Sequence, residues 1–353
     1  MFSSVKAFQK NAAEYGRSLI LDAGEGWNQF WFTPYQGPAI AWLRVATGVI
    51  SLLWWLSFLP DLSLWFGEKG VLPLSTLETL IGTGSRSVYR FSWFYLGESL
   101  LLTSCLWMLG LIAILLHTLG IFGRLSTLIS WSFVISTVHR MPMLTGLMEP
   151  VLTMSLAYLA IAAPQLNTKK LNTQKRLLWR GKQTPTTPLD LSLNRLAIRL
   201  LQVHALFFYV VMFSTQLRSD TWWEGEAIWT LMASSETRTL DLTLLGKTPW
   251  LLNLFTHGVL IFEIIFPILV WNQKLRPLLL TLSTIFWLFL GLTSGLLLFC
   301  LAMLSLSLAI WPETSTESGQ QKIPDPAYSV GATSFERRRR SGLRRSTSSS
   351  ARQ

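Results

Sequence analysis

Residues 200–229 read LLQVHALFFYVVMFSTQLRSDTWWEGEAIW. The first half is an apolar run that carries His204 and Tyr209, and a short polar segment containing Gln216 leads into Trp222 and Trp223. Tryptophan side chains favour the boundary between lipid and water. Polar groups next to lipid are costly unless the protein itself satisfies them. The stretch therefore predicts a membrane-spanning helix that ends beside a polar site.

The composition indicates an integral membrane protein. Hydrophobic residues make up 50% of the 353 residues and charged residues 14%, with 17 Trp and 20 Phe. A soluble domain usually has about 25% charged residues. The basic residues behind the net charge of +11 gather in a central loop and in the C-terminal tail, which is typical of cytoplasmic segments of membrane proteins. We therefore expect membrane lipids as partners, and the pattern argues against nucleic acid.

Eight stretches are suited to crossing a bilayer, whose core requires about 20 apolar residues of helix. They are residues 39–59, 99–119, 125–138, 146–163, 194–214 and 250–271, and two more within 275–312 that part near 291–295. The mixed, aromatic segment between 61 and 98 is typical of a loop with interfacial helices. The predicted fold class is all-α, a polytopic transmembrane helix bundle of about eight spans plus interfacial helices.

The loop over residues 164–192 sets the predicted orientation. It has no acidic residue before Asp190, and its basic residues are Lys169, Lys170, Lys175, Arg176, Arg180 and Lys182. Basic loops stay in the cytoplasm, and an even number of spans then places both termini there. We expect a multi-pass protein of the cytoplasmic (inner) membrane. It has an amphipathic N-terminal segment (1–38), a transmembrane domain (39–312) and a disordered basic cytoplasmic tail (313–353).

Few ionisable groups lie within or beside the expected spans, and these are the candidates for chemistry. Glu263, His204 and His257 can act as acids or bases. A lone histidine on an apolar helix is usually only a satisfied polar group, whereas two histidines with a carboxylate favour a site. His257 and Glu263 are six residues apart, so they share a helix face poorly, although either can meet residues of the 194–214 span.

Other polar residues leave their alternatives open. Arg44, near the start of the first span, either reaches the interface or faces inward to a carboxylate. No metal site is predicted, since Cys105 and Cys300 stand alone in apolar runs. The common phosphate-loop, HExxH and GxSxG motifs are absent from the sequence. A transporter would need paired interrupted helices, and only one Gly-interrupted pair is clear.

The order of these features resembles the HTTM (horizontally transferred transmembrane) family, whose membrane domain is shared with vitamin K-dependent gamma-carboxylase. Each similar piece is weak alone, and their order through roughly residues 25–312 is more specific. The pieces are Pro34 ahead of Leu43-Arg44-Val45-Ala46-Thr47-Gly48, Trp65-Phe66-Gly67-Glu68-Lys69-Gly70-Val71-Leu72-Pro73, Leu201-Gln202, Tyr209, Trp222-Trp223-Glu224-Gly225, and His257 through Glu263 to Pro267. The resemblance implies a reduced quinone as cofactor, with Tyr209, Trp222 and Gly225 as cofactor-binding residues.

In that carboxylase, the segment before the Trp-x-Glu-Gly motif carries a lysine regarded as the base for vitamin K hydroquinone. Gln216 occupies the matching position here, with Thr215 as a one-residue alternative, and neither side chain is a base. The first hypothesis is an HTTM-type protein without gamma-carboxylase activity that binds a quinone or lipid, or a membrane or secreted protein partner. The alternative is an active carboxylase-like enzyme of the lyase class that uses His257, His204 or Glu263 as its base.

Overall fold

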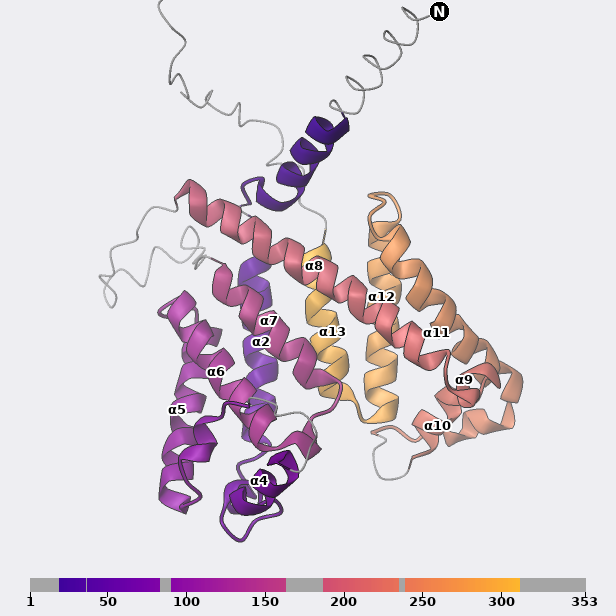
Figure 1. The fold of residues 1–353 in the computed structure, drawn as a ribbon. Helices are drawn as coiled ribbons and strands as arrows, with labels where there is room; N and C mark the ends of the chain where they lie inside the picture. The colour runs from indigo at the N-terminus through magenta and orange to yellow at the C-terminus, as the bar shows by residue number, and fades with distance from the viewer. Residues whose placement is uncertain (1–18, 36, 83–89, 163–186, 235–238, 312–353) are drawn as a thin grey trace, which may run out of the picture. The chain divides into compact units, whose positions relative to one another are not determined.

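The computed structural model describes residues 19–35, 37–82, 90–162, 187–234 and 239–311. The chain divides into two units, Met1–Pro312 and Glu313–Gln353, and the described residues belong to the first. The start of the expected N-terminal segment (1–18), most of the basic loop (163–186) and the expected tail lie outside the described residues. Every regular element among the described residues is a helix (Figure 1), which confirms the all-α prediction.

Each of the eight predicted spans corresponds to one helix, and some of these helices extend beyond the predicted bounds. The eight helices are α2 (Ala39–Leu56), α5 (Leu100–Thr118), α6 (Arg124–Arg140), α7 (Met148–Ile161), α8 (Pro188–Gln216), α11 (Pro249–Leu269), α12 (Arg276–Ser294) and α13 (Leu297–Ile310). Five of them, α2, α5, α8, α11 and α12, are long and apolar enough to cross a membrane by length and composition. The described fold is therefore compatible with an integral membrane protein.

The other three helices differ in length or polarity. α7 and α13 are apolar but have 14 residues each. At 1.5 Å per residue they are about 21 Å long, against a bilayer core of about 30 Å. α6 is rich in serine and threonine, whose hydroxyls donate to carbonyls of their own helix, as Ser130 does to Ser126 at 2.7 Å. A crossing by all eight helices stays a prediction.

α13 joins the two halves of the bundle. It packs against α2 and α7 and also against α8 and α12, and Figure 1 shows it between α2 and α12. Gly295 ends α12 with a left-handed φ of 76°, which allows the chain to turn back. The two helices then approach closely, since a Cβ on Gly291 would lie 3.0 Å from the Cβ of Cys300. Trp287 of α12 is fully buried in this contact, with its ring 5.5 Å from that of Phe299.

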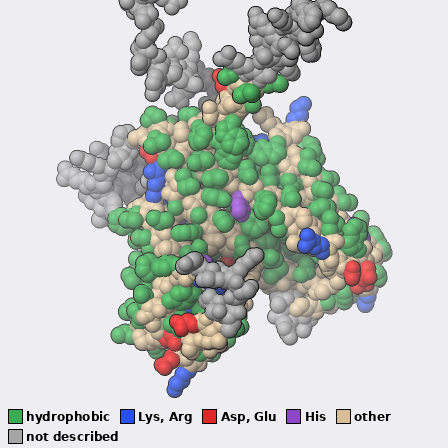
Figure 2. Space-filling view, viewed as in Figure 1, with side chains coloured by type: hydrophobic (Ala, Val, Ile, Leu, Met, Phe, Trp, Pro, Cys, Tyr) green, Lys and Arg blue, Asp and Glu red, His purple; other side chains and the backbone are tan. Residues whose placement is uncertain are grey.

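The surface of the bundle is largely apolar. Figure 2 shows hydrophobic side chains over much of one face, with few charged side chains among them. Large exposed apolar residues occur on several helices, for example Leu101 on α5, Phe207 on α8 and Ile268 on α11. An apolar surface of this extent is unstable in water and suits contact with lipid.

Short helices occupy the segment between α2 and α5. They are α3 (Leu62–Phe66), α4 (Leu74–Gly82) and the 3-10 helix η1 (Trp93–Leu96). Arg140, fully buried at the end of α6, donates to the carbonyl of Leu72 at 2.7 Å and pairs with Glu98 at 3.1 Å. Tyr95 donates to the carbonyl of His139 at 3.0 Å, and burial raises the pKa of this phenol, which keeps it protonated. Polar contacts thus fix this segment to the end of α6.

A helix over residues 19–32 precedes α2 and contacts α8. Arg199 donates from Nε to the carbonyl of Phe30 at 3.1 Å, and its guanidinium lies 4.3 Å from the centre of the Phe30 ring. One turn earlier, Arg195 donates from Nε to the carbonyl of Thr33 at 3.0 Å. Cations suit the C-terminal end of a helix, because its last carbonyls carry partial negative charge. Trp27 of this helix is exposed, and the place of the helix along a membrane surface stays a prediction.

Candidate functional site

Gln216 and Glu263 meet at the contact between α8 and α11. Nε2 of Gln216 donates to Oε1 of Glu263 at 3.1 Å, and Glu263 is fully buried. Within the described residues, the second carboxylate oxygen of Glu263, Oε2, and the amide oxygen of Gln216, Oε1, are buried and have no hydrogen-bond partner. Both atoms are acceptors, and we call them the acceptor pair. A buried acceptor without a donor is costly, so the acceptor pair indicates a place for a proton or for a donor group of a ligand.

Gln216 and Glu263 meet further along α11 than the sequence suggests. Gln216 is the last residue of α8, but Glu263 lies in the second half of α11, a helix of 21 residues. The N-terminal half of α11 continues past the end of α8 and is covered by α9 (Asp220–Trp223) and α10 (Ala227–Ala233). The sequence suggests a site at the outer ends of both helices. Gln216 instead meets α11 well beyond its first residue, because the loop after α8 packs beside the N-terminal half of α11.

Tyr209 lies on the same face of α8 as Gln216, two turns earlier. Its hydroxyl accepts a hydrogen bond from Nε1 of Trp287 at 2.8 Å and shares one with the hydroxyl of Ser283 at 3.1 Å. Its ring lies 4.5 Å from that of Phe266, one turn beyond Glu263 on α11. Tyr209 thus ties α8, α11 and α12 together next to the acceptor pair. The sequence does not predict Ser283 and Trp287 as partners of Tyr209, because a serine and a tryptophan in an apolar run are typical of the core.

Gly225 shapes the turn between α9 and α10. Its φ is +80°, and a Cβ there would lie 2.6 Å from Oδ1 of Asn253. The buried hydroxyl of Thr256 donates to the Gly225 carbonyl at 2.9 Å and accepts from the backbone N–H of Ile228 at 3.3 Å. Thr256 is not among the predicted site residues. Its position directly before His257 is the sequence feature that could have drawn attention to it.

The segment around Trp222 and Gly225 sits on α11 away from the acceptor pair. Trp222 packs against an apolar cluster formed by Ile228, Met232, Leu252 and Val259. Thr256, which holds Gly225, precedes Glu263 by seven residues on the same helix face, or about 10 Å along the axis. The contacts of Trp222 and Gly225 are therefore those of a turn that packs on α11.

The two predicted histidines lie apart from the acceptor pair. His257 is exposed, and its Nδ1 lies 2.8 Å from the carbonyl oxygen of Asn253 on its own helix. His204 is half-buried, with Nδ1 3.2 Å from the Tyr158 hydroxyl of α7 and its ring 5.1 Å from that of Phe208. The structure thus pairs Gln216 with Glu263, packs Tyr209 against Phe262 and Phe266 on either side of Glu263 in the α11 sequence, and leaves each histidine in separate surroundings.

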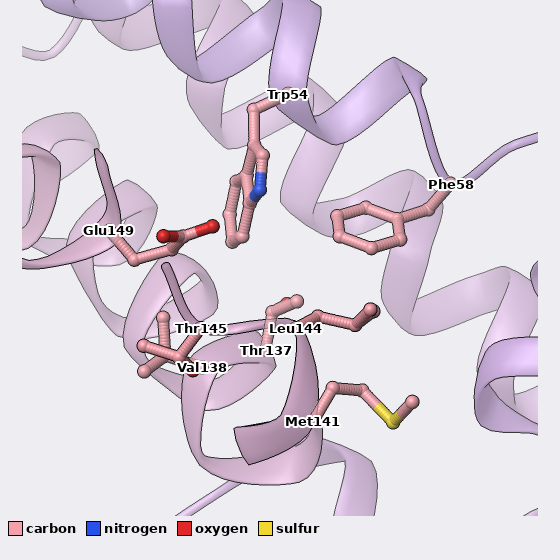
Figure 3. Close-up of a pocket in the computed structure, with 8 residues that line it drawn as sticks. All are labelled: Trp54, Phe58, Thr137, Val138, Met141, Leu144, Thr145 and Glu149. Carbon is pink, nitrogen blue, oxygen red and sulfur yellow. The ribbon is translucent and has the colours of Figure 1, made fainter. Parts of the chain in front are cut away.

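A second carboxylate, Glu149, lines the pocket shown in Figure 3. The space between its atoms is about 160 Å³ when the open solvent at its mouth is included, but the pocket itself cannot hold a water molecule. It is lined by Trp54, Phe58, Thr137, Val138, Met141, Leu144, Thr145 and Glu149. Oε2 of Glu149 accepts a hydrogen bond from the backbone N–H of Gly146 at 2.8 Å, just before α7 begins. Glu149 therefore provides the hydrogen-bond acceptor for a backbone N–H just before α7. The pocket is too small for a cofactor.

In the part of the chain that the structure describes, no three His, Cys, Asp or Glu side chains gather in a way that could hold a metal ion. No protein-family model, curated protein or solved structure matches this chain. The class that fold and site define is an all-helical bundle, compatible with a membrane, with a buried amide–carboxylate pair.

Proposed function

We propose that this chain is an HTTM-type integral membrane protein that binds a lipid-soluble molecule carrying a hydroxyl group at the acceptor pair. A reduced quinone fits this description. We further propose that the chain lacks gamma-carboxylase activity, since Gln216 occupies the place of the expected lysine. The observation that carries the proposal is the acceptor pair itself, Oε2 of Glu263 and Oε1 of Gln216.

A hydroxyl donor matches the chemistry of the acceptor pair. Neither a carboxylate oxygen nor an amide oxygen can donate, so a partner must bring the hydrogen. A hydroquinone carries two hydroxyl donors on an apolar ring. The neighbouring aromatic rings suit such a ring, since Phe262 lies 5.3 Å from Phe266 and 5.7 Å from Phe286 between ring centres. A ligand of this kind supplies donors without adding a charge inside the membrane.

The bond between Gln216 and Glu263 supports binding in preference to base catalysis at Gln216. An amide does not take up a proton near neutral pH, and the Gln216 amide already donates to Glu263. The second candidate function, an active quinol-oxidising or carboxylating enzyme, is favoured by one observation. Glu263 is the ionisable member of the acceptor pair, whereas His257 and His204 are engaged elsewhere. If the chain is an enzyme, Glu263 is its base.

Binding is tested with the purified full chain in a mild detergent. Reduced menaquinone is titrated while tryptophan fluorescence is followed, and co-isolated lipids are extracted and identified by mass spectrometry. We expect Glu263→Gln to weaken binding by about tenfold, because one acceptor is lost or turned into a donor. Glu149→Gln is the matched control, since it changes another buried carboxylate and leaves the acceptor pair intact.

Two results would contradict the proposal. The first is a wild-type chain that neither co-isolates a hydroxyl-bearing lipid or quinol nor responds to reduced menaquinone. The second is an affinity for reduced menaquinone that is the same in Glu263→Gln and in the wild type.

A further inference from the structure

A buried arginine lies at the junction of α2, α5 and α6, away from the acceptor pair. Arg44 is 5% exposed. Within the described ranges its guanidinium forms no ion pair or hydrogen bond, and Nη2 is buried without a partner. Neither sequence-based alternative for Arg44 holds there, because the side chain does not reach the surface and no described carboxylate faces it. An isolated buried charge is unfavourable, so the site calls for an anion.

Among the described residues, the groups around Arg44 are two hydroxyls, an imidazole and a second guanidinium. Thr47, on the next turn of α2, lies 3.4 Å from Nε2 of His117, whose Nδ1 lies 2.9 Å from the hydroxyl of Thr127. Arg44 and Arg124, the first residue of α6, each lie one helical turn before Thr47 and Thr127, so both guanidinium groups belong to the same end of this contact. Two guanidinium groups near each other repel, and a shared anion removes the repulsion.

Among the described residues, Asp190 is an acid near this junction, and its partner is Arg124. The two form an ion pair at 2.8 Å, with the Arg124 side chain 41% exposed. Among the described groups of the junction there are two guanidinium groups and one carboxylate, so their charge balance is positive.

The turn between α5 and α6 adds a backbone site for an anion. Gly120, Phe122 and Gly123 have positive φ angles of 70°, 58° and 54°, and Gly123, the residue before α6, provides no side-chain cap. The N-terminal end of a helix carries partial positive charge and free N–H groups. Leu119 and Leu125 are exposed on either side of the turn, together with Phe122, and offer apolar contacts.

We propose that this junction binds the phosphate of an anionic membrane phospholipid, with Arg44 and Arg124 as its cationic ligands. Arginine matches phosphate well, because its planar fork donates two parallel hydrogen bonds. The acyl chains lie along Leu119, Phe122 and Leu125. The expected orientation places this end of the bundle in the cytoplasm, and the cytoplasmic leaflet carries negative lipids.

The test compares three probes on the purified full chain in a neutral detergent. They are dioleoylphosphatidylglycerol, dioleoylphosphatidylcholine and inorganic phosphate, and tryptophan fluorescence reports the midpoint of thermal unfolding. We expect the phosphatidylglycerol to raise the midpoint by about 3 °C or more, and the other two to raise it far less. In Arg44→Gln the apparent affinity for phosphatidylglycerol, measured by native mass spectrometry, falls by about fivefold or more. Lys274→Gln, an exposed charge in the turn before α12, keeps the wild-type response.

Three outcomes would overturn the proposal. A wild-type chain that responds to none of the probes excludes an anion site. An equal response to inorganic phosphate and to phosphatidylglycerol assigns the site to a free anion and excludes the lipid. An unchanged phosphatidylglycerol response in Arg44→Gln excludes Arg44. If Arg44→Gln does not fold, Arg124→Gln decides, because a reduced response in that variant supports the site and a full response overturns it.

Discussion

The indole Nε1 of Trp287 donates to the hydroxyl of Tyr209 at 2.8 Å and thereby joins α12 to α8 inside the bundle. Tyr209 is 2% exposed and Trp287 is fully buried, so neither group can turn to water. Polar bonds of this kind hold helices in one arrangement where apolar contacts alone would tolerate several.

Tyr209→Phe is expected to lower stability. The change leaves the Trp287 N–H and the Ser283 hydroxyl without their partner, at a cost of about 1–3 kcal/mol. Thermal unfolding of the purified protein in detergent measures the effect. Tyr158→Phe serves as control, because Tyr158 is only half-buried and its bond to His204 is near the surface. An unfolding midpoint in Tyr209→Phe equal to that of the wild type would show that the bond adds nothing.

Gln216→Lys is expected to create hydroquinone-dependent oxygen uptake that the wild type lacks. The new amine stands beside Glu263 and can take up a proton, which raises the rate by about 100-fold or more over the wild type. Oxygen consumption with reduced menaquinone or vitamin K hydroquinone measures this. Gln273→Lys introduces the same charge at an exposed position before α12 and should stay inactive. Uptake by the wild type that disappears in Glu263→Gln would instead make Glu263 a working base.

Gly225→Ala is expected to destabilise the loop after α8. Its φ of +80° disfavours any residue with a Cβ, and the added Cβ would meet Asn253 at 2.6 Å. The left-handed conformation alone costs about 1–2 kcal/mol. Gly258→Ala on α11 is the matched control, since its Cβ meets nothing within 4 Å and a helical glycine gains from the change. Equal unfolding midpoints for the two variants would contradict the role of Gly225.

Glu98→Gln is expected to loosen the segment between α2 and α5. It leaves the fully buried Arg140 without its carboxylate, at a cost of about 3 kcal/mol. Limited proteolysis should then cut between 61 and 98 at least about tenfold faster. Glu68→Gln, in the same segment, provides the comparison. Cleavage at an equal rate in both variants would show that Arg140 does not depend on Glu98.

The helices could be predicted because a long apolar run is rarely compatible with another structure. Some helix boundaries differ from the predicted ones. α8 begins at Pro188, six residues before the predicted 194, since Thr187 and Asp190 cap it. The Thr187 hydroxyl accepts from the Asp190 N–H at 3.2 Å, and Asp190 accepts from the Thr187 N–H at 3.1 Å. This Thr-Pro-x-Asp pattern was visible in the sequence. α6 extends to Arg140, whose guanidinium donates to Glu98 and to the carbonyl of Leu72, and only the folded chain reveals these contacts.

Gln216 and Glu263 could each be selected from the sequence, but the hydrogen bond between them could not. The spacing of six between His257 and Glu263 correctly indicated different helix faces, since one is exposed and the other buried. The bond between Gln216 and Glu263 links residues 47 apart in sequence. It depends on the axial position of α11 relative to α8, and the hydrophobic periodicity within either helix does not determine that position. The roles of these residues as catalytic or cofactor-binding groups stay predictions.

The place of α13 between α2 and α12 has a consequence for biosynthesis. Ribosomes deliver helices to the membrane in chain order, so α2 is inserted roughly 250 residues before its neighbour α13 emerges. Until then, the faces of α2, α7 and α8 that α13 will cover are open to lipid or to passing chaperones. A nascent chain that stops before Leu297 keeps those faces open, and cellular quality control can recognise it as unfinished. The docking of α13 is therefore the step that covers these faces of α2, α7 and α8.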